Sequence, residues 1–180
     1  MRKPPATIFP RPIATNMSEP APLDSAFKPL IGTDEAIIDG KGRVLVSKKK
    51  RERLGEPFAM ALSDTGCLIA YPEPVWRQMF TEIMKYDSIN QGRQQYTRLV
   101  LGLAEDELKF DGQGRVVIPQ KLRDLAKLNK EVLIVGCGDR AEIWAKEEWE
   151  QFNNYPDTYG QQRREAIQKA YTQMTGRVIG

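Results

Sequence analysis

Short apolar runs, each bounded by turn residues, dominate the chain between residues 33 and 152. Residues 115–119 (RVVIP) and 131–136 (EVLIVG) are rich in β-branched side chains, a composition typical of short strands. Between them, residues 120–128 (QKLRDLAKL) place leucines at helical spacing directly after Pro119, which favours the first turn of a helix. The pattern therefore predicts a strand, a helix and a second strand in this part of the chain.

This arrangement occurs twice. Residues 39–46 (DGKGRVLV) are repeated, with two conservative changes and one Lys-to-Gln change, as residues 111–118 (DGQGRVVI) at an offset of 72. Two aromatic positions return at an offset of 73, Tyr71 as Trp144 and Trp76 as Trp149. Each copy is expected to run strand, turn, strand, basic helix, strand, turn, strand and a helix that begins with acidic residues. Since a unit of about 45 residues rarely buries enough apolar surface to fold alone, the two copies should share one core or bury surface in an oligomer.

The same pattern divides the chain into five parts and predicts an α+β fold that is mainly β. Residues 1–29 are rich in proline and poor in aromatic and branched side chains, so they should form a disordered tail, within which Met17 offers a second start of translation. The other parts are a first unit at 33–80, connecting helices at 81–105, a second unit at 106–152 and a C-terminal tail with an amphipathic helix at 153–180.

Apolar faces at helical spacing support the helices expected outside the repeated strands. Two of these faces, in residues 77–86 and 94–104, should pack on the strands as core helices. Their members are Met79, Phe80, Ile83 and Met84 in the first and Tyr96, Leu99, Val100 and Leu103 in the second. A third face, in residues 161–174, should either dock on a neighbouring molecule or fray, and its members are Ala166, Ile167, Ala170, Tyr171 and Met174.

Composition disfavours catalysis. The 180 residues contain no histidine, the commonest general base and metal ligand. Cys67 and Cys137 stand in apolar surroundings, which is typical of reduced, buried packing residues and not of a disulfide or metal site. No segment approaches the roughly 18 consecutive apolar residues of a membrane span. We therefore expect no enzymatic activity, no cofactor, no metal, no small-molecule substrate and no membrane association, and we expect the protein in the cytoplasm.

Positive charge is concentrated in the first copy. The formal net charge is only +3, but residues 41–53 (KGRVLVSKKKRER) carry seven cationic side chains against one acid, whereas the matching residues 113–125 carry three against one. With Ser47 as N-cap, three lysines would lie in the first helical turn, where the helix dipole disfavours each by roughly 0.3–1 kcal/mol. A nearby polyanion would offset that cost. We therefore expect Lys41, Lys48 and Lys49 to bind DNA phosphates, although a basic run alone is more often a solvated face.

Each copy of the turn also places an aspartate four residues before an arginine. The positions are Asp39, Gly42 and Arg43 in the first copy and Asp111, Gly114 and Arg115 in the second. Asp-Gly favours a type I′ hairpin turn, in which both central residues need positive φ. An arginine at such a tip can reach O6 and N7 of guanine, with the aspartate fixing its direction. The alternative is an exposed ion pair that only closes the turn, worth roughly 0–1 kcal/mol. The neighbouring basic run favours base contact for Arg43, whereas for Arg115 both base contact and a structural ion pair stay open.

The repeated motif resembles a known family. DGKGR and DGQGR in register, together with residues 114–152 after the second turn, are similar to MraZ, the bacterial transcriptional regulators of the division and cell wall gene cluster. The likeness covers about residues 30–152 and is closer in the second half. It implies two SpoVT-AbrB (MazE-like) swapped-hairpin β-barrel units forming an internal pseudo-dimer and a ring-like homo-oligomer associated with the nucleoid. It also implies that Arg43 and Arg115 contact double-stranded DNA at short repeats upstream of the protein's own operon.

The chain departs from the family pattern in its N-terminal tail and in the first helix. Ser47 stands where the second copy has Pro119, and Lys50 stands where it has Leu122, which puts the packing of the first helix in question. We expect the first unit to carry more of the DNA contact and the second more of the stability. An antitoxin of the MazE type, or another protein-interaction module, is the alternative; the doubled unit and the N-terminal position of the tail argue against it, and a carboxylate enzyme lacks any motif.

Overall fold

The computed structural model describes residues 28–176. The expected proline-rich tail lies outside the described residues except for its last two positions, as do residues 177–180 of the C-terminal part. The first repeat contains β1 (Leu30–Ile37), β2 (Arg43–Leu45), α1 (Lys48–Leu54), β3 (Phe58–Leu62), β4 (Leu68–Pro72) and α2 (Glu73–Met84). The second contains β5 (Ala104–Leu108), β6 (Arg115–Val117), α4 (Gln120–Leu125), β7 (Glu131–Gly138), β8 (Ala141–Ala145) and α5 (Lys146–Asn154). The predicted order of elements is therefore confirmed in both copies.

Six strands form one antiparallel sheet in the order β1-β7-β8-β4-β3-β5. Its two edge strands are exchanged between the repeats: β1 of the first pairs with β7 of the second, and β5 of the second pairs with β3 of the first. Neither repeat therefore has a sheet of its own. The fold is mixed α and β, and the expected sharing of one core is confirmed, because one cluster of buried apolar side chains draws on both repeats.

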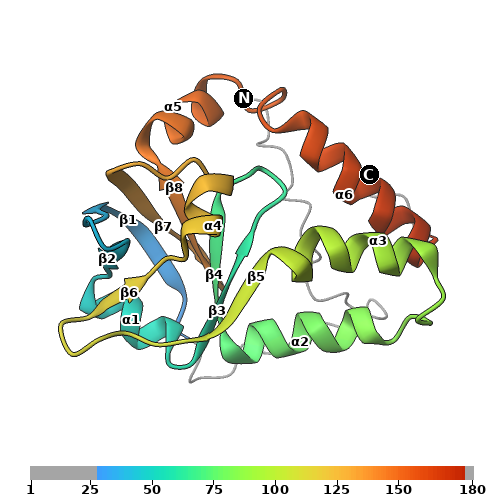
Figure 1. Cartoon of the computed structure of the whole chain (residues 1–180), viewed down its shortest axis with the longest axis horizontal. Helices are drawn as coiled ribbons and strands as arrows, with labels where there is room; N and C mark the ends of the chain where they lie inside the picture. Colours follow the sequence, from blue (N-terminus) through green and yellow to red (C-terminus); the bar gives the residue numbers. More distant parts are fainter. Residues whose placement is uncertain (1–27, 177–180) are drawn as a thin grey trace.

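A two-stranded antiparallel ribbon, β2 with β6, joins the repeats a second time. Val44 lies opposite Val116 at its centre, and both side chains are buried in the shared core. The ribbon lies on one side of the molecule, and the helices α2, α3 (Gln91–Val100) and α6 (Gln161–Thr175) gather on the other (Figure 1). This separation leaves the two Asp–Arg turns, which lead into β2 and β6, on the side away from these three helices.

The central strands carry apolar side chains on both faces. In β3 and β4, Met60 and Leu68 face the shared core, whereas Ala61 and Ile69 face a second cluster built with the helices. The predicted core helices α2 and α3 supply Met79, Ile83, Tyr96 and Val100 to this second cluster, while Phe80 stays exposed. Strands buried on both faces read as continuous apolar runs instead of alternating ones, as FAMAL and LIAYP do here.

The C-terminal helix α6 packs on α3 of the same chain. The expectation that its apolar face would dock on a neighbouring molecule or fray was therefore wrong. Its buried members are Ile167, Ala170, Tyr171 and Met174, whereas Ala166 is exposed. Gly92 permits the contact, because a side chain there would overlap the backbone of Gln173 and Met174. Arg163 adds three donated hydrogen bonds to carbonyl oxygens, those of Ser63 (2.6 Å), Leu62 (3.2 Å) and Leu99 (3.0 Å).

The two cysteines are free thiols, as expected, but only Cys67 is fully buried. Burial raises the pKa of the Cys67 thiol well above its ordinary value and raises the pKa of Cys137 to about 12. Thiols in this state are poor nucleophiles and poor metal ligands. Within residues 28–176, no helix is both long and apolar enough to cross a membrane.

Candidate nucleic-acid interface

The first Asp–Arg turn is closed by its own backbone and by the aspartate side chain. The amide of Gly42 donates to the carbonyl of Asp39 (2.9 Å), and the amide of Asp39 donates to the carbonyl of Arg43 (2.9 Å). Asp39 Oδ1 accepts from the amides of Lys41 (2.9 Å) and Arg43 (3.0 Å). Only Gly42 adopts a left-handed conformation, with φ of 76°, so the turn is not the type I′ turn expected from Asp39-Gly40. The left-handed glycine instead ends the turn, as in longer hairpin loops with a bulge.

The second turn repeats this geometry bond for bond. The amide of Gly114 donates to the carbonyl of Asp111 (2.8 Å), and the amide of Asp111 donates to the carbonyl of Arg115 (2.7 Å). Asp111 Oδ1 accepts from the amides of Gln113 and Arg115, both at 2.9 Å, and Gly114 has φ of 80°. Two segments separated by 72 residues have thus folded alike, because each turn is specified by hydrogen bonds within five residues.

Each arginine is held by its aspartate. In the first turn, Arg43 Nε and Nη2 lie 2.8 and 2.7 Å from Asp39 Oδ2. In the second, Arg115 Nε and Nη2 both lie 2.8 Å from Asp111 Oδ2. Both arginine side chains are 28% exposed. The aspartate engages one edge of the guanidinium, so the donors of the other edge stay available to a ligand, in a direction that the ion pair fixes.

The same contacts keep both aspartates ionised. The hydrogen bond from the Arg43 guanidinium, followed by that from the Arg43 amide, lowers the pKa of Asp39 from 3.8 to about 2. The pKa of Asp111 is also lowered, first by the Arg115 amide and then by its guanidinium. A depressed pKa means that the ionised carboxylate stabilises the folded state. For Asp39 this stabilisation is fully present above the ordinary pKa of 3.8 and is lost as pH falls through about 2.

This geometry gives a prediction for NMR. The carboxyl carbon of Asp39 should titrate with a midpoint near 2, and the Arg43→Gln variant should move that midpoint up toward 3.8, because the strongest donor is removed. The midpoint of Asp111 should move in the same direction but by less when Arg115 is replaced by Gln, because its strongest donor is the Arg115 amide, which stays in place. A midpoint for Asp39 that is already near 3.8 in the unchanged protein would mean that the turn does not hold its arginine in solution.

The outer face of the ribbon combines the two arginines with two apolar side chains. In the antiparallel register Arg43 lies opposite Val117, and Leu45 lies opposite Arg115. Side chains alternate along a strand, so all four point away from the core-facing pair Val44 and Val116. Leu45 and Val117 are 56% and 52% exposed, although both are large apolar residues. The ribbon therefore presents a face of two cations and two apolar groups, arranged with twofold symmetry.

The expected phosphate-binding lysines lie on the surface beside this ribbon. Lys41 is exposed in the first turn, and Lys48 and Lys49 are exposed at the start of α1. Lys48 makes one loose ion pair with Glu52, with a separation of 3.8 Å, in which both side chains are well exposed. Such a pair contributes little and leaves the ammonium available. The structure thus brings three of the four lysines in the basic run to a surface that a polyanion could reach.

Lys50 lies in the first turn of α1 with Lys48 and Lys49, as expected, but it does not belong to this surface. Its side chain is buried, 3% exposed, and its ammonium lies 3.0 Å from Asp34 Oδ2 on β1. Ser47 stands at the N-cap position but does not cap the helix; its hydroxyl donates to the same Asp34 oxygen at 2.6 Å. The two positions that depart from the second repeat, Ser47 and Lys50, are therefore explained by one shared partner.

The sequence pattern missed two arginines that touch the turns. Arg51 of α1 lies against Gly114, and Arg123 of α4 lies against Gly42, so each helix reaches the turn of the other repeat. A signal was available, because Arg51 and Arg123 occupy the same position of the two repeats at the offset of 72. The shared position was not enough to predict the contact, because a cationic side chain on a short helix usually points into solvent.

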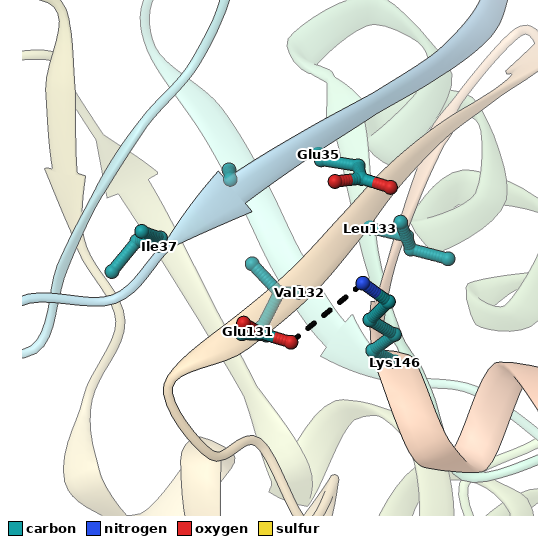
Figure 2. Close-up of a pocket in the computed structure, with 7 residues that line it drawn as sticks. Glu35, Ile37, Glu131, Val132, Leu133 and Lys146 are labelled. Carbon is teal, nitrogen blue, oxygen red and sulfur yellow. Dashed lines mark ion pairs between the residues drawn. The ribbon is translucent and has the colours of Figure 1, made fainter.

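A shallow hollow on the outer face of β1 and β7 is the other concave feature of interest (Figure 2). Its charged members are Glu35, Glu131 and Lys146, and Lys146 Nζ lies 3.7 Å from Glu131 Oε2. Two carboxylates against one ammonium make this hollow unsuited to a polyanion. Among the residues that the structure describes, no group of three His, Cys, Asp or Glu side chains could hold a metal ion.

The fold and the paired turns define a class of protein: two α/β repeats that exchange strands and present matched Asp–Arg turns beside basic helices. A family model described as "MraZ protein, putative antitoxin-like" matches the chain over residues 30–99 and again over residues 102–169. The chain belongs to the MraZ family, and the resemblance inferred from DGKGR and DGQGR is confirmed.

Curated relatives agree with this assignment. The chain is 38% identical over 128 residues to "Transcriptional regulator MraZ" of Thermoanaerobacter sp. (strain X514), covering 71% of this chain and 89% of the relative. It is 42% identical over 118 residues to the protein of the same name from Carboxydothermus hydrogenoformans, covering 66% and 80%. It is 40% identical over 117 residues to that of Chromobacterium violaceum, covering 63% and 78%.

Proposed function

We propose that this protein is a sequence-specific DNA-binding transcriptional regulator. Its relatives are named as transcriptional regulators and not as enzymes, which supports a non-catalytic role. The observation that carries the proposal is the pair of arginines, Arg43 and Arg115, held in matching directions on one two-stranded ribbon. The major groove of DNA admits a two-stranded ribbon, and a planar guanidinium can donate to O6 and N7 of guanine there.

The remaining surface residues supply the other kinds of contact that DNA recognition needs. Lys41, Lys48 and Lys49 would neutralise phosphates, which position the protein without reading sequence. Leu45 and Val117 flank the arginines and could pack on thymine methyl groups, which would give the ribbon an apolar element of sequence readout. Asp39 and Asp111, with Gly42 and Gly114, keep the arginines in place.

The finer features implied by the family are part of the same proposal. The exchange of β1 and β5 between repeats supports two swapped-hairpin AbrB-type units that close a barrel and act as a pseudo-dimer. We propose that the protein acts on its own division and cell wall operon through short repeated promoter sites, and therefore works in the bacterial cytoplasm at the nucleoid. The proposal also includes a larger share of DNA contact for the first repeat. Its unit boundaries are 33–80, 81–105 and 106–152.

We also propose a ring-like homo-oligomer, supported by apolar side chains that this chain leaves exposed. They are Ile31 and Ile37 on β1, Phe80 on α2 and Ile89 after it. Subunits joined in a ring would bind repeated DNA sites together, which raises the overall affinity without new contacts to any single site. Light scattering at micromolar concentration tests this, and a monomer there would contradict it.

DNA from upstream of the protein's own gene tests the proposed function by fluorescence anisotropy. We expect affinity to fall steeply with salt, because each neutralised phosphate adds roughly 0.9 to the slope of log affinity against log salt. Replacing Lys41, Lys48 or Lys49 by Gln should each lower that slope by about one. Lys85→Gln is the control, since Lys85 lies at the end of α2 and pairs with Glu82 at 2.5 Å. Equal binding to a scrambled duplex would contradict sequence-specific recognition.

The family description, with its words "antitoxin-like", favours one second function, a MazE-type antitoxin or another protein-interaction module. Purification of the tagged protein from its native cells distinguishes the two. A small toxin recovered in equal amount, with no affinity for the upstream DNA, would support the second function and contradict the first.

A further inference from the structure

Each turn is covered by an arginine from the helix of the other repeat. A Cβ placed on Gly42 would lie 2.8 Å from both Cζ and Nη2 of Arg123, and one placed on Gly114 would lie 2.6 Å from Nη1 of Arg51. At either glycine a Cβ would therefore displace the guanidinium from its present position. The flat guanidinium groups therefore lie directly on the backbone of the turns, in a crossed arrangement that the twofold relation of the repeats produces.

Backbone hydrogen bonds follow the same crossed arrangement. The amide of Val46, which leads from β2 into α1, donates to the carbonyl of Gly114 at 3.2 Å. The amide of Ile118, which leads from β6 into α4, donates to the carbonyl of Gly42 at 2.9 Å. Each turn glycine is thus held from both sides by the other repeat, through its carbonyl oxygen and through its Cα.

The two arginines have no other evident partner that would explain their position. The Nε atoms of Arg51 and Arg123 are buried and lack a hydrogen-bond acceptor among the described residues. Arg123 Nη2 donates to Gln120 at 2.5 Å, but within residues 28–176 neither guanidinium forms an ion pair. Burying part of a cation without an acceptor is unfavourable, so the contact with the turn must offset it through packing of the flat group and of its aliphatic stem.

We propose that Arg51 positions the turn that carries Arg115, and that Arg123 positions the turn that carries Arg43. This inference rests on the proposed DNA binding, because it concerns how the reading arginines are aimed. It also assigns the basic helix α1, with Lys48 and Lys49, to the second turn and not to the turn of its own repeat. The basic charge of the first repeat then supports Arg115 of the second, so the first repeat's larger share of DNA contact is a share of the phosphate contacts, while base contact is divided between the two arginines.

Double-mutant cycles with the upstream duplex test the crossed assignment. The variants are Arg51→Ala, Arg123→Ala, Arg43→Ala and Arg115→Ala, alone and in pairs, each measured at one fixed salt concentration. We expect Arg51→Ala and Arg123→Ala each to weaken binding about fivefold to tenfold, and each effect to be largely lost once the arginine of the opposite repeat has been removed. The pairs within one repeat, Arg51 with Arg43 and Arg123 with Arg115, should be additive. Additivity in the crossed pairs would overturn the proposal.

Hydrogen exchange without DNA gives a second measurement that does not depend on binding. Arg51→Ala should speed exchange of the Gly114 amide and leave the Gly42 amide unchanged, and Arg123→Ala should do the reverse. A uniform increase at both turns would indicate general destabilisation and would also overturn the crossed assignment. If the wild-type protein fails to bind the duplex while the crossed exchange pattern is present, the proposed function is wrong and the positioning role stands.

The lysine variants separate positioning from direct charge. Arg51→Lys and Arg123→Lys keep the cation but lose the flat group, so they should resemble the alanine variants in affinity while leaving the salt dependence of binding almost unchanged. They also serve if an alanine variant does not fold. Full affinity in the lysine variants, or a salt slope lowered by about one in the alanine variants, would indicate a direct phosphate contact and contradict the positioning role.

Discussion

Replacing Arg43 by alanine should weaken binding to the upstream duplex by about ten- to a hundredfold, and Arg115→Ala should have an effect of the same order. A bidentate contact between an arginine and guanine discriminates by roughly 1–3 kcal/mol, and both side chains are already aimed by an aspartate before DNA arrives. In an oligomer that binds repeated sites the loss recurs in every subunit, which places the observed change at the upper end of that range.

The measurement is fluorescence anisotropy at fixed salt, with the upstream duplex and a scrambled duplex of equal length. Loss of a base contact should lower affinity for the upstream duplex much more than for the scrambled one, whereas loss of a phosphate contact lowers both. Arg77→Ala is a matched control. Arg77 also lies four residues after its acidic partner, and its Nε donates to Glu73 at 2.8 Å, but both residues lie on α2. Unchanged affinity after Arg43→Ala would disprove the proposed base contact.

The parts of this structure that the sequence predicts well are the local ones. The turns at Asp39–Arg43 and Asp111–Arg115 depend on hydrogen bonds within five residues, so a repeated five-residue motif was enough to predict the two Asp–Arg ion pairs. The order of helices and strands followed from the period of the apolar residues in the same way. Even here the turn type was wrong, because Asp-Gly alone does not specify which glycine takes positive φ.

The parts that the pattern of residues alone did not predict, without the family resemblance, depend on contacts between distant segments. The exchange pairs β1 with residues about a hundred positions later and β5 with residues about 45 positions earlier, and nothing in the local pattern distinguishes it from a hairpin within each repeat. The crossed contacts of Arg51 and Arg123 follow from that exchange. The packing of α6 on α3 requires a residue without a side chain at Gly92. The burial of Lys50 depends on its ion pair with Asp34, which lies on β1. Each of these becomes visible only once the strands have been placed.

Lys50 and Asp34 give the largest expected effect on stability. In the second repeat the matching position is Leu122, which is also buried, so the first repeat has replaced an apolar core residue by a buried ammonium. Burial alone would raise the pKa of Asp34, but the hydrogen bonds from Ser47 and Lys50 and the nearby lysine charges outweigh it, and the pKa is lowered. The stabilisation by this carboxylate is therefore present above its ordinary pKa of 3.8 and is lost as pH falls below that value.

Asp34→Ala should lower the free energy of unfolding by about 3 kcal/mol at neutral pH, because it leaves the Lys50 ammonium buried without its partner. The estimate is the lower end of the usual range, since Asp34 is partly exposed and water can reach the site. Lys50→Leu, which copies the second repeat, should instead be neutral or stabilising by about 1–2 kcal/mol. The double variant should recover most of the loss, because it removes both charges together.

Urea unfolding at one protein concentration measures all three variants, with the concentration fixed because assembly also contributes to apparent stability. Asp106→Ala is the matched control: Asp106 holds the position of Asp34 in the second repeat at the offset of 72, it is exposed, and it lies on β5. That control should change stability by less than about 0.5 kcal/mol. If Asp34→Ala were as mild as Asp106→Ala, Lys50 would have to reach water in solution, and α1 would then be free to present all of its lysines on the DNA-facing surface.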